Sequence, residues 1–142
     1  MILISHRGNT EGKTSQENHP DYIMKAYNWG YDVEIDVWFI DNKYYLGHDE
    51  PIYETNLDFV KNRHFWVHCK NLDALYNLSN YKKDINYFWH QDDEYTLTSW
   101  GVIWTFPGKI LTNYSVAVLP ELYTNTKLDK CYGICSDYIK RY

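Results

Sequence analysis

The stretch VEIDVWFIDNKYYLGHDE, residues 33–50, joins a core strand to a row of ionisable side chains. Strict alternation predicts a strand with one apolar face and a second face that carries Glu34 and Asp36. The dipeptide Asp41-Asn42 predicts a turn, after which KYYLGHD predicts a short returning strand. Two carboxylates beside a core surface need a partner, because an unpaired buried charge is costly. The apolar face consists of Val33, Ile35, Val37 and Phe39.

The segments before this stretch predict one strand and one helix. Residues 2–6 predict the strand, and the polar segment RGNTEGKTSQEN follows it. Asn18 or His19 can cap a helix that has Pro20 in its first turn, and Gly30 suits the end of that helix.

The segments after this stretch predict a second helix and several strands. The sequence FWVHCK, residues 65–70, alternates again and carries His68 and Lys70 on one face. Asn71 can cap a short helix over residues 72–80. Further strand candidates are 86–91, 101–108, 115–121 and 132–137.

The order of these elements favours an α/β fold. Strands alternating with helices in the front half suggest a parallel sheet or barrel with crossover helices. The links 92–100 and 109–114 are shorter than the roughly dozen residues that a parallel crossover usually needs. Either some strands of the back half are antiparallel, or the layer is irregular there. We expect one domain over residues 1–142.

Composition and charge narrow the class of protein. The chain is 44% hydrophobic and 23% charged, as is ordinary for a globular protein. A net charge of -5 argues against a general nucleic-acid binder, which would present a basic face. The three cysteines, Cys69, Cys131 and Cys135, form no complete disulfide framework, so we expect buried thiols in a cytoplasmic protein. Neither a signal peptide nor a membrane span is readable, and we expect no stable membrane insertion.

Ionisable residues at predicted strand ends point to a binding or catalytic site. Glu34 and Asp36, with one further ligand, form an oxygen-rich site that suits Mg²⁺ or Ca²⁺. Taken alone, the same pair is also compatible with the solvated face of an edge strand. His6 and His48 lie at or just after strands, where imidazoles can exchange protons near neutral pH.

Two cations and several aromatic side chains leave alternatives open. Arg7 and Lys70 can hold an anionic oxygen. For His68 and Lys70, a hydrogen-bonded structural histidine and a surface lysine are as compatible with the sequence as a ligand pair. We expect Trp66, Trp89 and Trp104 in the core, although one at the mouth of a barrel would contact a substrate alcohol. His90, at a strand end, is expected to be structural or exposed.

Five segments, in order, resemble the signature segments of glycerophosphodiester phosphodiesterases. They are SHRGN, QENHP, VEIDVWF, LGHDE and GICSDY, and they extend from His6 to Asp137. That family belongs to the phosphatidylinositol-phosphodiesterase-like TIM-barrel superfamily. Because full (β/α) barrels run to about 250 residues, the resemblance implies a compressed or incomplete TIM-like barrel with several outer helices missing.

The resemblance implies an acid/base pair and a phosphate site. His6 and His48 match the two histidines of the family and would exchange protons during catalysis. Arg7 and Lys70 match its phosphate-binding cations. The nucleophile would be water, or a substrate hydroxyl that gives a cyclic phosphate.

The resemblance also implies a metal site with one altered ligand. Glu34 and Asp36 would bind a divalent cation, Mg²⁺ or Ca²⁺. His68 would be the third ligand, at a position where the family usually has an acid. Because histidine is a softer ligand than Mg²⁺ prefers, this substitution leaves weaker binding, a different metal and loss of activity open. Glu17 matches the glutamate of the second segment, and Asp49 would support His48.

The expected function is therefore a divalent-metal-dependent phosphodiester hydrolase. Its substrate would be a glycerophosphodiester-like small molecule or a lipid headgroup, and nucleic acid is not expected as a partner. An alternative is a non-catalytic phosphate-ester-binding module on a degenerate barrel. A third reading, a structural domain without a site, predicts that Glu34, Asp36, His6 and His48 do not meet in space. The oligomeric state is not indicated by the sequence.

Overall fold

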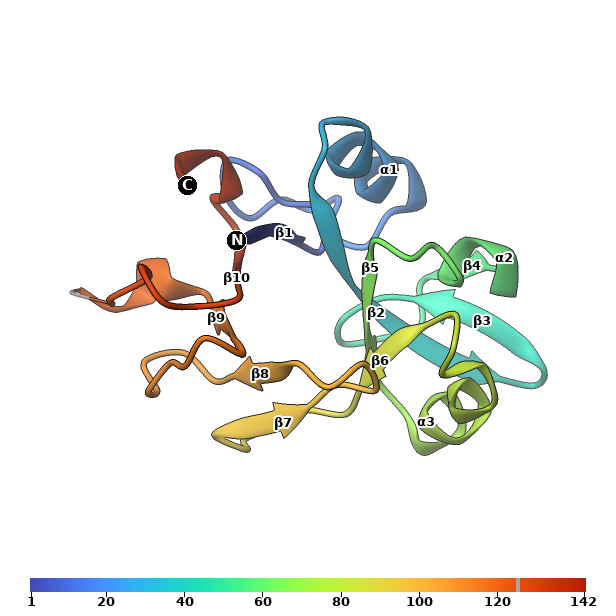
Figure 1. Ribbon diagram of the computed structural model, residues 1–142. Coiled ribbons are helices and arrows are strands. Elements are labelled where there is room, and N and C mark those ends of the chain that lie inside the picture. The colour runs from blue at the N-terminus through green and yellow to red at the C-terminus, as the bar shows by residue number, and fades with distance from the viewer. Residues whose placement is uncertain (125) are drawn as a thin grey trace.

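The computed structural model describes residues 1–124 and 126–142, within which one curled, ten-stranded sheet forms the centre of the molecule (Figure 1). Neighbouring strands are parallel along the series β6-β5-β2-β1-β10-β9-β8. Strands β3, β4 and β7 run antiparallel to their neighbours at the margins. The strands are β1 (Ile2–His6), β2 (Asp32–Ile40), β3 (Lys43–Leu46), β4 (Tyr53–Thr55), β5 (Phe65–Cys69), β6 (Asn86–Phe88), β7 (Tyr95–Leu97), β8 (Ile103–Thr105), β9 (Ser115–Val118) and β10 (Gly133–Ser136).

The curl brings the two ends of the parallel series towards each other. Ser99 donates its backbone N–H to the Tyr87 carbonyl at 2.9 Å, and its hydroxyl accepts the Tyr87 N–H at 2.9 Å. The rings of Phe88 on β6 and Trp104 on β8 lie 4.7 Å apart. These contacts connect β6 to the segment that leads into β8.

Helices cover the strands of the front half. Asparagine or histidine side chains cap the α-helices, because each accepts a backbone N–H of the first turn. The helices are α1 (Pro20–Asn28), α2 (Leu57–Val60) and α3 (Leu72–Leu78), and the 3₁₀ turns are η1 (Ser79–Tyr81), η2 (Pro120–Leu122) and η3 (Ile139–Arg141). Among the described residues, no helix has the length and apolar run that crossing a bilayer requires.

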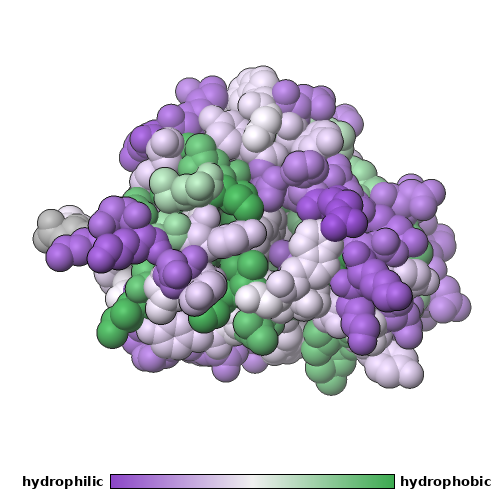
Figure 2. Space-filling model, in the orientation of Figure 1, coloured by the Kyte–Doolittle hydropathy of each residue, from purple (hydrophilic) through white to green (hydrophobic). Residues whose placement is uncertain are grey.

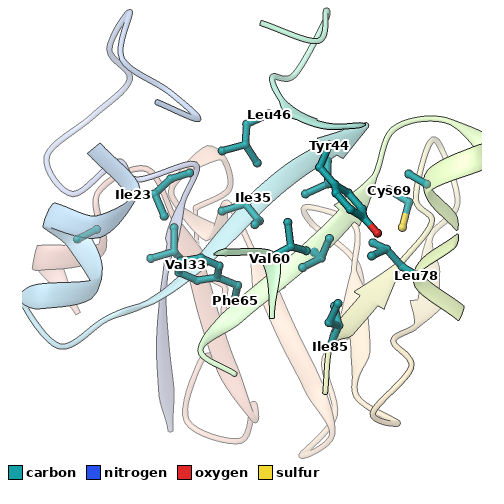
Figure 3. Close-up of a cluster of buried hydrophobic side chains, with 14 residues drawn as sticks. Ile23, Val33, Ile35, Tyr44, Leu46, Val60, Phe65, Cys69, Leu78 and Ile85 are labelled. Carbon is teal, nitrogen blue, oxygen red and sulfur yellow. The ribbon is translucent and has the colours of Figure 1, made fainter. Parts of the chain in front are cut away.

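Two apolar clusters lie on opposite faces of the sheet. The first fills the space between the helices and the outward faces of β2 and β5, and Figure 3 shows most of its side chains. The second lies inside the curl and takes one or two residues from each of six strands. Its buried members are Ile4, Trp66, Phe88, Trp104, Val116, Val118 and Cys135. Both faces of β2 are covered. Its apolar side chains point into the first cluster, and the side chains that alternate with them point into the curl rather than into solvent.

The structure is a mixed α/β fold with few helices, consistent with an incomplete barrel. A strand lies within each predicted strand segment, and both predicted helices are present, although α3 ends at Leu78 and continues as η1. The four candidates of the back half are shorter than predicted: 86–91, 101–108, 115–121 and 132–137 contain β6, β8, β9 and β10. Both alternatives for the back half occur together: β7 is antiparallel, and the link 106–114 joins parallel β8 and β9 without a helix. The short elements β4, α2 and β7 were not predicted; they lie in residues 51–62 and 92–100, outside the segments in which an alternating or helical pattern was found.

The cysteines are free thiols in the structure. Cys69 and Cys135 are buried, and burial raises the pKa of Cys69 to about 12. Cys131 is only partly buried, so the prediction of three buried thiols is wrong at this position. The difference arises because Cys131 precedes β10 rather than lying in it.

Candidate metal centre

The carboxyl ends of three neighbouring strands carry the ionisable residues. Register pairs His6 of β1 with Glu34 of β2, and Asp36 of β2 with His68 of β5. Lys70 follows directly after β5. Since all three strands are parallel, their carboxyl ends meet at one edge of the sheet. That edge opens into a cavity of about 490 Å³. Its ionisable lining consists of His6, Arg7, Lys13, Glu34, His48, His68, Lys70, His90 and Asp92.

Glu34, Asp36 and His68 can hold a metal ion. One ligating atom of each residue lies within 4.8 Å of those of the other two. Glu34 and Asp36 are buried, and their Oε2 and Oδ1 atoms have no hydrogen-bond partner within the described residues. Buried acceptor oxygens without a partner are costly, and a divalent cation would satisfy them. The donor set therefore fits a metal ion and leaves the identity of the cation open.

The two carboxylates differ in charge. Burial and the neighbouring Asp36 charge raise the pKa of Glu34 well above its ordinary value. Burial also opposes ionisation of Asp36, but the adjacent His48, His68 and Arg7 hold its pKa well below the ordinary value. Asp36 is therefore the more readily ionised member of the pair, and a nearby cation would favour ionisation of Glu34 as well.

Asn18 and Arg7 hold Asp36 in place. Asn18 donates from Nδ2 to Asp36 Oδ2 at 2.8 Å and accepts the Asp36 backbone N–H at 2.9 Å. The Arg7 Nε atom lies 3.0 Å from the same Oδ2, and Nη1 donates to Glu17 at 3.3 Å. Although burial lowers the pKa of Arg7, the charges of Asp36, Glu34 and Glu17 raise it overall. Arg7 thus forms ion pairs with Asp36 and Glu17 and also lines the cavity.

The turn after β1 depends on unusual backbone angles. Arg7 has a φ of +56° and Gly8 a φ of +91°. A Cβ atom on Gly8 would lie 2.6 Å from the ring of Tyr22, so a larger residue fits neither the angle nor the space. This turn directs the chain so that Arg7 and His6 face the same cavity.

His6 is oriented by Asp137, which lies at the other end of the sequence. The Nδ1 atom of His6 is 2.7 Å from Asp137 Oδ1, and Asn9 donates to the same oxygen at 2.8 Å. Because Asp137 can only accept while ionised, Nδ1 carries a proton, and the Nε2 atom faces Glu34, 3.8 Å from Oε2. Burial opposes the charge of Asp137, but His6 and Asn9 hold its pKa below the ordinary value.

His48 reaches the site from the loop after β3. Gly47 has a φ of +152°, and a Cβ there would lie 1.9 Å from the Glu50 carbonyl oxygen, so the tight turn requires glycine. The His48 Nδ1 atom lies 3.6 Å from Asp36 Oδ2, and the side chain is 40% exposed. Asp49 is 3.6 Å from His48 but 92% exposed, which makes it a weak support.

Lys70 and His68 border Asp36 from β5. The Lys70 Nζ atom lies 3.8 Å from Asp36 Oδ1. His68 Nδ1 is 3.1 Å from the same oxygen and 3.7 Å from Glu34 Oε1. The predicted residues therefore lie close together, whereas the hypothesis of a structural domain without a site expected them to lie apart. Their chemical roles stay predictions.

The opposite wall of the cavity is apolar and comes from the back half. Trp104 is buried, as expected, and it also lines the cavity, which the alternative of a tryptophan at the mouth of a barrel allowed for. On the face of the molecule that Figure 2 shows, apolar residues lie at the surface in the middle and left, among hydrophilic ones. The apolar lining consists of Trp104, Phe106, Pro107, Val118, Leu119 and Leu122.

Sequence reasoning missed several supporting residues. Asp137 was part of the GICSDY segment, but no role was assigned to it, although an acid after a core strand is the same signal as Glu34. Asn9 and Asn18 follow the first strand within a polar loop, where nothing local distinguishes them from turn residues. Glu121 accepts the Asp137 backbone N–H at 2.9 Å, a contact across sixteen residues that no sequence pattern indicates.

Comparisons with protein-family models, curated proteins and solved structures find no match for this chain. The resemblance to glycerophosphodiester phosphodiesterases therefore rests on the five segments quoted above.

Proposed function

We propose that this chain is a divalent-metal-dependent phosphodiester hydrolase on an incomplete TIM-like (β/α) barrel. One observation carries the proposal: Glu34 and His68 of the candidate metal group line the same cavity as His6, which the buried Asp137 orients. Metal ligands beside an oriented proton acceptor and cationic side chains are the parts that phosphodiester hydrolysis uses. The order of the five segments supports the same reaction.

Each part of the site has a role in this proposal. A cation held by Glu34, Asp36 and His68 would draw negative charge from a phosphate oxygen. Lys70, at the cavity, would hold a second phosphate oxygen, and Arg7 would keep Asp36 ionised while its remaining donors face the substrate.

Two histidines would move the protons. His6 Nε2 would accept the proton of the attacking hydroxyl or water as the new oxygen–phosphorus bond forms. His48, exposed at the mouth, would donate a proton to the alcohol oxygen as its bond to phosphorus breaks. The assignment follows from His6 having its Nδ1–H held by Asp137, which leaves Nε2 as the acceptor.

The apolar wall suits a diester with an apolar part. Trp104, Phe106 and Leu122 face the ionisable side of the cavity. A substrate that presents phosphate to one wall and carbon surface to the other would satisfy both. The proposed substrate is accordingly a small-molecule or lipid-headgroup phosphodiester.

Hydrolysis of glycerophosphocholine and bis(p-nitrophenyl) phosphate tests the proposal. With a divalent cation we expect turnover that EDTA abolishes, and His6→Asn should lower kcat by about 10²–10⁴-fold because proton transfer is lost. Glu34→Gln should weaken activation by the cation. His19→Asn is the matched control, because His19 caps α1 and asparagine can replace that cap.

Equal turnover by the wild type, His6→Asn and Glu34→Gln would refute the proposal. If no cation supports turnover while phosphate esters bind tightly, the chain is the non-catalytic binding module instead. The substitution of an acid by His68 is the feature that favours that second candidate.

A further inference from the structure

We propose that the Glu34, Asp36 and His68 group selects a first-row transition-metal ion, such as Mn²⁺, Co²⁺ or Zn²⁺, over Mg²⁺ and Ca²⁺. This inference deepens the proposed function and rests on its metal site, but it does not depend on hydrolysis. It replaces the Mg²⁺ or Ca²⁺ expected from the sequence with a cation class argued from the geometry of His68.

The ring of His68 presents a nitrogen, and only Nδ1, to the carboxylates. Its Nε2 atom lies 2.7 Å from the backbone carbonyl oxygen of His90. A carbonyl oxygen only accepts, so Nε2 carries a proton and donates it. Nδ1 is then the atom that faces the carboxylates, 3.1 Å from Asp36 Oδ1 and 3.7 Å from Glu34 Oε1, and it is the ligating atom when a cation takes the place of its proton.

The ring is held in this orientation. The Phe88 ring stacks on it with a centroid distance of 5.3 Å and an interplanar angle of 8°. A backbone partner for the second nitrogen is the usual way in which a protein orients a metal-binding histidine. His68 therefore does not depend on a metal ion to adopt the ligating orientation.

The surrounding atoms disfavour ions that need many oxygens. Ca²⁺ takes six to eight oxygen ligands, and Mg²⁺ strongly prefers oxygen. The nearby acids Glu17 and Asp137 already accept hydrogen bonds from Asn9, and they also pair with Arg7 and His6. A set of two carboxylates and one imidazole suits Mn²⁺, Co²⁺ or Zn²⁺, for which imidazole is a good ligand.

Calorimetric titration of the metal-stripped full chain with Mn²⁺, Co²⁺, Zn²⁺, Mg²⁺ and Ca²⁺ at neutral pH tests the selectivity. We expect the three transition-metal ions to bind about tenfold or more tightly than Mg²⁺ and Ca²⁺. His68→Glu should shift the preference towards Mg²⁺ and Ca²⁺, because it supplies a third carboxylate. His19→Asn should leave the preference unchanged.

A second measurement needs no variant. Electron paramagnetic resonance of the Mn²⁺-loaded wild type should show coupling to one imidazole nitrogen, and that coupling should be absent in His68→Glu. Binding of Mg²⁺ or Ca²⁺ as tight as that of Zn²⁺, absence of nitrogen coupling, or no metal binding would each overturn the inference. Transition-metal selectivity without turnover on any phosphodiester would uphold it while refuting the hydrolase.

Discussion

Residues 1–90 and 91–142 contribute parallel strands to the same curled sheet but support them differently. In the first region, α1 and α3 pack on β2 and β5 over the cluster of Figure 3. In the second, the described residues contain no α-helix, and loops with η2 and η3 accompany the strands (Figure 1).

The two regions also contribute different kinds of side chain to the cavity. The ionisable residues that approach Asp36 come from the first region, whereas its apolar wall comes from the second. A buried charge needs partners at fixed positions, and an apolar contact tolerates small shifts, because only the former is directional. The helix-supported region therefore carries the part of the site that requires precise geometry.

The largest expected effect tests whether the two regions differ in how much stability a buried side chain contributes. Ile35 and Ile134 are equally buried, but Ile35 lies under helices, whereas η3 packs beside β10. Replacement of each by alanine should lower the free energy of unfolding by about 2–5 kcal/mol. The value for Ile35 should lie nearer the upper end, because neighbours held by helices would fill the resulting cavity less completely. Urea denaturation measures both values, and Ile110→Ala, at an exposed position, should change little. A larger cost at Ile134 would contradict the difference in support.

The next effect concerns Asp137, the link by which the second region orients His6. Its pKa is lowered in the folded state, so its ionised form stabilises the fold above the unfolded pKa of about 3.9. That stabilisation is lost as the pH falls through the lower, folded pKa. Asp137→Asn should cost about 1.5–3 kcal/mol at pH 7, because a charged hydrogen-bond acceptor is removed.

The stability difference between wild type and Asp137→Asn should therefore narrow as the pH falls below about 3.9. Denaturation at a series of pH values tests this dependence. Asp41→Asn is the control, because Asp41 is exposed in a turn with a φ of +49° that asparagine adopts readily. A pH-independent difference would show that the Asp137 charge is not the stabilising feature.

The smallest effect concerns the apolar wall. Leu122 is 63% exposed and lines the cavity, so Leu122→Ala should leave stability unchanged. It should raise KM for an aryl phosphodiester about two- to fivefold, since only part of one side chain's apolar contact is lost. Leu97→Ala, similarly exposed on β7, should not change KM. A change in kcat alone would place Leu122 in the chemical step rather than in binding.

Local sequence patterns were sufficient to predict several residues of the candidate site. Alternation in residues 33–39 and 65–70 separated Glu34, Asp36 and His68 from the apolar face, because side chains of a strand point to opposite sides in turn. A helix-capping residue and a proline were sufficient to predict where α1 begins. The apolar lining by Leu119 and Leu122 was not predicted, because these residues follow β9 in an irregular segment without periodicity.

The sequence by itself determined which residues share a strand face and where most strands lie, since both depend on neighbours within a few positions. Only the tertiary structure decided that β10 pairs with β1 and that Asp137 lies against His6, across 131 positions. It also decided that β2 is covered on both faces, so that its acids are buried. Strand order and sheet curvature depend on long-range pairing and packing, which no local pattern in this chain records.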